Sequence, residues 1–102
     1  MNADDQTRLL EDLRSLLEEQ IAMARAGNYR RLETLTLKSA PVVEDLRKSG
    51  AFEQARFAAQ CKQITKLYNK LELAVAGEKN SIETQQRQIA GSKKTLRAYL
   101  NS

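Results

Sequence analysis

The chain has no histidine and no tryptophan among its 102 residues, and it has a single cysteine. Without histidine, it lacks the commonest general base and the most frequent transition-metal ligand. One cysteine can neither close an internal disulfide nor build a zinc site, so Cys61 is interpreted as a small, partly buried residue in a reducing compartment. Phosphate-binding and dinucleotide-binding glycine motifs are also missing. These absences argue against an enzyme, and we expect no catalytic residue, no metal and no cofactor.

Carboxylates occur as adjacent pairs, including Glu18-Glu19 and Glu44-Asp45. Neighbouring side chains on an α-helix point about 100° apart, so the two members of such a pair do not face each other. We therefore interpret the pairs as solvated helix surface and not as acid–base dyads.

Proline occurs once and glycine four times, so the chain has few places to turn. The remaining composition is dominated by strong helix formers, namely leucine, alanine, glutamate, lysine, arginine and glutamine. The predicted fold class is all-α, an antiparallel helical hairpin packed on a long third helix. The whole chain, residues 1–102, is expected to form this single domain.

Two amphipathic segments predict the hairpin. Apolar residues recur every three or four positions over residues 4–26, as on one face of a helix. Gly27 suits the left-handed position that ends a helix, and Asn28 can cap a second helix over residues 28–49. A link this short favours antiparallel neighbours. Pro41 lies within the second segment and is expected to kink or divide it near Ser39.

The third predicted helix covers residues 52–100. Its apolar period continues without a proline, and Gly77 and Gly91 weaken it by only about 1 kcal/mol each relative to alanine. Such a helix would be roughly 70 Å long, about twice the length of the hairpin. We therefore expect residues 84–102 to overhang the hairpin as a partner-binding tail that adds little to the core.

Charge is distributed unevenly along the chain. Residues 1–26 contain six acidic and three basic residues, whereas residues 51–102 contain four and nine, and no carboxylate follows Glu83. The acidic, polar N-terminus does not resemble a targeting signal, and no apolar run reaches the length of a membrane span, so a cytoplasmic protein without membrane insertion is expected. The basic half is interpreted as a solvated helix face, with nucleic-acid binding as the alternative.

The stretches "LLEEQIAMARAGNYRRLETLTLKSAPVVEDL" and "GSKKTLRAYLNS" together resemble the FlgN-like flagellar export chaperones. In that family a leucine-rich helix, a turn of the Ala26-Gly27-Asn28 kind and a second leucine-rich helix precede a long helix with a basic, tyrosine-containing tail. The chain is shorter than is usual for the family, and Pro41 departs from its pattern.

The resemblance implies a cytosolic chaperone that binds hook–filament junction proteins and keeps them soluble for type III secretion. The client, a hook-associated export substrate, would contact the C-terminal helix. The apolar contact would come from Ile82, Ile89, Leu96, Tyr99 and Leu100. Orientation and association rate toward an acidic client would be set by Lys93, Lys94 and Arg97.

Two other functions stay open. One is a nucleic-acid-associated helical protein, although we expect no specific nucleic-acid partner because the positive charge is mixed with acids and aromatic residues are few. The other is a structural coiled-coil adaptor whose long third helix forms a homodimer. The sequence does not distinguish an overhang that binds a client from one that binds its own copy.

Overall fold

The computed structural model describes residues 1–76 and 83–100, and these residues form helices without any β-strand. The prediction of an all-α protein is therefore confirmed. The helices are α1 (Ala3–Ala26), α2 (Tyr29–Lys48), the short 3₁₀ helices η1 (Ala51–Glu53) and η2 (Ala55–Phe57), α3 (Ala58–Val75) and α4 (Glu83–Leu100).

Helix α1 begins with a capping box. The Asp5 amide donates to the Asn2 side-chain oxygen at 2.9 Å, and the Asn2 amide donates to the Asp5 carboxylate at 3.3 Å. Two amides that no helical carbonyl can reach are thereby satisfied. The helix thus begins at Ala3 with Asn2 as its cap, one residue before the predicted range of 4–26.

The turn between α1 and α2 has the predicted chemistry. Gly27 adopts φ 74°, the left-handed region that glycine enters without steric cost. The Asn28 side-chain oxygen accepts from the Arg31 amide at 3.2 Å, which caps α2. Pro41 does not divide α2, which continues from Tyr29 to Lys48.

The junction after α2 holds the start of α1. Gln6 is only 3% exposed, and its amide donates to the Ser49 carbonyl at 3.1 Å while its oxygen accepts from the Gln54 side chain at 3.2 Å. Phe52 and Phe57, in the two 3₁₀ helices, are also buried. The segment 50–57 is therefore a packed corner and not the beginning of a long helix.

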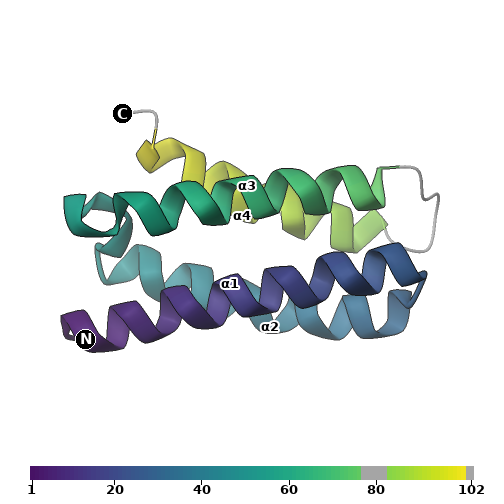
Figure 1. The fold of residues 1–102 in the computed structure, drawn as a ribbon, viewed down its shortest axis with the longest axis horizontal. Coiled ribbons are helices and arrows are strands. Elements are labelled where there is room, and N and C mark those ends of the chain that lie inside the picture. Colours follow the sequence, from purple (N-terminus) through teal and green to yellow (C-terminus); the bar gives the residue numbers. More distant parts are fainter. Residues whose placement is uncertain (77–82, 101–102) are drawn as a thin grey trace.

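The predicted third helix over residues 52–100 is wrong, because α3 covers only Ala58–Val75 and α4 is a separate helix. Helix α4 lies antiparallel to α3 (Figure 1) and packs against α3 and α2. The physical reason is burial: a straight continuation would leave Ile89 and Leu96 in water, whereas here they are 2% and 1% exposed. The prediction that the C-terminal segment overhangs the hairpin is wrong for residues 84–100 for the same reason, and residues 101–102 lie outside the described residues.

The four helices form two stacked hairpins. Helix α1 packs on α2 and α3, and α4 completes the other side against α3 and α2 (Figure 1). The Cα radius of gyration is 13.2 Å, close to the roughly 13 Å expected for a compact domain of this length. Side chains from all four helices and both 3₁₀ helices meet in one core, which includes Leu10, Leu13, Leu17, Leu32, Leu46, Phe52, Phe57, Ile64, Tyr68, Leu71, Ile89 and Leu96.

Candidate functional site

The apolar residues predicted for client contact lie mainly inside the bundle. Ile89 and Leu96 belong to the core, and Leu100 is half-buried against it. Ile82 lies outside the described residues. In this conformation the side chains of Ile89 and Leu96 are inaccessible to a partner.

Tyr99 is half-buried and holds the end of α4 against the corner after α2. Its ring lies 5.8 Å from the Phe52 ring, centroid to centroid, with the planes tilted by 48°. Such an arrangement is favourable for two aromatic rings. The pKa of Arg47 is raised, mainly by the Glu44 carboxylate beside it and to a lesser extent by the Tyr99 hydroxyl. Tyr99 therefore links α4 to both α2 and η1.

The three basic residues of the predicted site differ in their surroundings. Lys93 forms an ion pair with Glu72 of α3, and its side chain is 19% exposed. Lys94 and Arg97 are exposed on the outer side of α4. Only these last two are positioned to meet a partner without any rearrangement of the bundle.

A shallow apolar groove lies beside the Lys93–Glu72 pair, between α3 and α4. It measures about 420 Å³ and is lined by Asn69, Glu72, Leu73, Ala76 and Lys93. Leu73 is 79% exposed, more than the other large apolar side chains described in the structure. A second hollow of about 180 Å³ continues past Ala90 to Lys94 and Arg97.

Sequence reasoning missed Leu73, although a signal for it was present. Leu71 and Val75 lie on the buried face of α3. A residue two positions after Leu71 is rotated by about 200°, which places it on the opposite side of the helix. An apolar residue out of register with an amphipathic period is exposed, and Leu73 could have been recognised on that ground.

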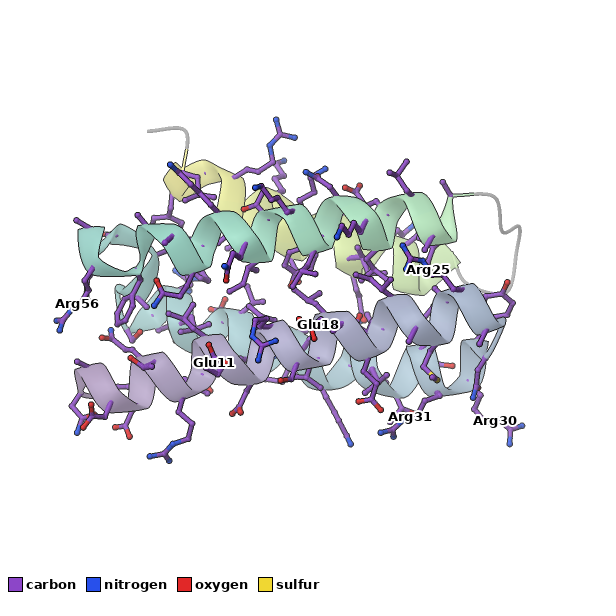
Figure 2. The ribbon with its side chains drawn as sticks, viewed as in Figure 1. Glu11, Glu18, Arg25, Arg30, Arg31 and Arg56 are labelled. Atoms are coloured by element: carbon purple, nitrogen blue, oxygen red, sulfur yellow. The ribbon has the colours of Figure 1, made fainter. Side chains whose placement is uncertain are left out.

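Charged side chains gather on the outside of the α1–α2 hairpin, where most are paired. Arg14 donates to both Glu11 and Glu18 at 2.9 and 2.8 Å, and Arg31 donates to Glu19 at 3.1 Å. Figure 2 shows Glu11 and Glu18 along the surface of α1, and Arg30 pointing away from the bundle where α2 begins. Glu11, Glu18 and Glu19 of α1 are therefore engaged within the molecule, whereas Asp4 and Asp12 form no ion pair with a described residue.

The side chains that most often carry chemistry are not assembled into a centre in the described part of the chain. No group of three or more Cys, Asp or Glu side chains there is placed to hold a metal ion. Cys61 is 1% exposed, and burial raises the pKa of its thiol. A buried thiol that stays protonated is a poor nucleophile.

No helix within residues 1–76 and 83–100 combines the length and the apolar character that a bilayer crossing requires. No protein-family model matches the chain, and no match was found among curated proteins or solved structures.

Proposed function

We propose that this protein is an export chaperone of the FlgN-like type, which binds flagellar hook–filament junction proteins in the cytoplasm and keeps them soluble for type III secretion. The proposal has no catalytic step, metal or cofactor. One observation carries it: α4 has an apolar row, Ile89 and Leu96, and a separate basic row, Lys94 and Arg97. An acidic amphipathic client segment could use both rows.

The two rows differ in accessibility, and this sets the order of contact. Lys94 and Arg97 can attract a client to the closed bundle. Contact with Ile89 and Leu96 requires α4 to separate from α2 and α3. Full burial of two such side chains stabilises docking by roughly 3–6 kcal/mol, which client contacts must replace.

We do not retain the hypothesis of a coiled-coil adaptor, because the long third helix that it requires for a homodimer is divided into α3 and α4. Nucleic-acid association stays a second candidate on one specific observation. Lys62, Lys66 and Lys70 are all exposed on α3 and form no ion pair with another described residue.

The test is a titration with the C-terminal segment of a hook–filament junction protein, followed by stopped-flow kinetics. Reversing charge in the variant Lys94→Glu with Arg97→Glu should slow association and weaken its salt dependence, with a smaller effect on dissociation. Both side chains are exposed, so the fold should persist. Lys38→Glu, an exposed change on α2, is the matched control and should leave association nearly unchanged.

Separation of α4 has its own readout. Amide hydrogens of α4 should exchange faster with solvent when the client is bound if the client displaces the helix from α2 and α3. A segment that does not bind the wild-type chain would overturn the proposed function. Binding that leaves exchange in α4 unchanged would show that the client uses only the outer surface.

A further inference from the structure

The outer face of α3 carries a ridge of unpaired cations. Lys62, Lys66 and Lys70 recur every four residues, so each is about 6 Å further along the same side of the helix. The ridge lies opposite the buried residues Ile64, Tyr68 and Leu71. The one carboxylate on α3, Glu72, is already paired with Lys93. None of the three lysines forms an ion pair with a described residue, although Glu18 of α1 lines a hollow together with Lys66 and Lys70.

Helix α4 extends this surface. Lys94 and Arg97 border the hollow that continues from the α3–α4 groove. Between the two basic rows, Leu73, Ala76 and Ala90 line hollows that they share with the Lys93–Glu72 ion pair. We name this surface the outer α3–α4 face and define it by the residues Lys62, Lys66, Lys70, Leu73, Ala76, Ala90, Lys94 and Arg97.

We propose that the outer α3–α4 face of the closed bundle is a docking surface for an acidic amphipathic helix of another protein. Glutamates spaced four residues apart on that helix match the spacing of the lysine ridge, and an apolar row beside them covers Leu73. Opposite charges across such a contact fix its register and accelerate encounter. This contact goes beyond the proposed client site, because α4 stays docked and Ile89 and Leu96 stay buried.

The surface fits a protein helix better than a phosphate backbone. Leu73 is the most exposed large apolar side chain among the described residues, and a phosphate backbone offers that side chain no apolar partner. Single-stranded nucleic acids also need aromatic stacking platforms. The nearest tyrosines are not available for this purpose, since Tyr68 is 1% exposed and Tyr99 packs on Phe52.

The surface also fits another protein better than a second copy of this chain. The acidic helix of a second copy would have to be α1. Its Glu11 and Glu18 are already bound to Arg14, and its Glu19 is bound to Arg31, which leaves only Asp4 and Asp12 without an ion pair to a described residue. Docking α1 of one copy on the lysines of another would compete with these internal pairs, whereas a foreign acidic helix has no such competition.

The experiment measures fluorescence anisotropy of a labelled helical peptide of about four turns, with glutamates four residues apart and leucines beside them. The same peptide with glutamine in place of glutamate is the ligand control. Wild type should bind the acidic peptide, and Leu73→Ser or the double change Lys66→Glu with Lys94→Glu should weaken binding at least about tenfold. Lys38→Glu should have no such effect.

Leu73→Ser should fold as well as wild type, because a side chain that is 79% exposed contributes little to the core. Melting curves of each variant check this, and amide shifts on peptide addition should cluster on α3 and α4. Absence of peptide binding, or binding insensitive to Leu73→Ser, would overturn the proposal. So would tighter binding of a labelled single-stranded DNA that ignores Leu73→Ser, which would assign the surface to a phosphate backbone.

Sedimentation of the protein alone completes the test. A dimer that Leu73→Ser converts to monomer would assign the surface to a second copy and overturn the proposal, whereas a monomer in both cases supports it. The outcomes also separate this inference from the proposed function. If the hook–filament junction segment does not bind the protein, binding of the acidic peptide still supports this inference. If the acidic peptide does not bind, capture of the client by α4 still stands as a proposal.

Discussion

At the residue scale, the interior of the bundle contains two buried polar side chains whose hydrogen bonding is incomplete. The Gln20 side chain is 0% exposed, and its oxygen lies 3.1 Å from the Thr36 hydroxyl, while its Nε2 has no partner among the described residues. The Tyr68 hydroxyl also lacks a hydrogen bond in good geometry with any described group. Unsatisfied buried polar atoms are costly, so the Gln20 Nε2 and the Tyr68 hydroxyl each offset part of the stabilisation that burial of the rest of the side chain provides.

Tyr68 leads to a prediction on alkaline pH. Burial raises the pKa of its hydroxyl from 10.0 to about 12, and the nearby Ser92 side chain offsets this only in part. The unfolded chain therefore loses this proton near pH 10, whereas the folded chain keeps it. Between these values the unfolded state binds fewer protons, so the free energy of unfolding falls as pH rises.

The measurement is thermal melting from neutral pH to about pH 12 for wild type and Tyr68→Phe. The phenylalanine variant should lose less stability above pH 10, by up to about 2 kcal/mol, because it has no hydroxyl to ionise. All other side chains are common to the two proteins, so their contributions cancel in the comparison. Parallel losses in the two proteins would show that Tyr68 ionises in the folded state near its ordinary pKa.

At the element scale, the sequence predicted α1 and α2 well because their end signals are local. Gly27 and Asn28 specify the turn between them through backbone conformation and one cap. The division between α3 and α4 has no comparable single signal: Gly77, Asn80 and Ser81 are weak helix formers, but none of them prohibits a helix. Whether the segment forms one helix or two depends on the burial of Ile89 and Leu96 against α2 and α3, which is a long-range effect.

Leu96 provides the test of that packing. Leu96→Ala should lower the free energy of unfolding by about 2–5 kcal/mol, because the side chain is 1% exposed in the core. Lys94→Ala, an exposed change on the same helix, should stay within about 0.5 kcal/mol of wild type. Urea unfolding measures both. Equal stability of Leu96→Ala and wild type would restore the sequence-based prediction that the tail adds little to the core.

Across the whole molecule, the two hairpins differ in charge. Residues 1–50 contain nine acidic and eight basic residues, whereas residues 51–102 contain four and nine. The sequence revealed this asymmetry, but the fold makes it a surface property, because it places α3 and α4 together as one layer (Figure 1). The residues predicted to contact a client were less well predicted. Apolar periodicity identifies a helix face that becomes buried, but it does not show whether that face packs against a partner or against the protein's own core.

This polarity yields a prediction for nucleic acids. Weak binding to the lysine ridge should fall steeply with salt, with a slope of log K against log salt of about −3 to −4 if about four cations contact phosphates. The variant Lys66→Glu with Lys70→Glu should flatten that slope, whereas Lys38→Glu on α2 should not. Filter binding of random and defined-sequence DNA between low and physiological salt measures both effects.

We expect no sequence preference, because the ridge presents ammonium groups without an exposed aromatic beside them, and ammonium groups contact phosphates without reading bases. Sub-micromolar, sequence-selective binding at physiological salt would contradict this expectation and make nucleic-acid recognition the better account of the α3–α4 layer.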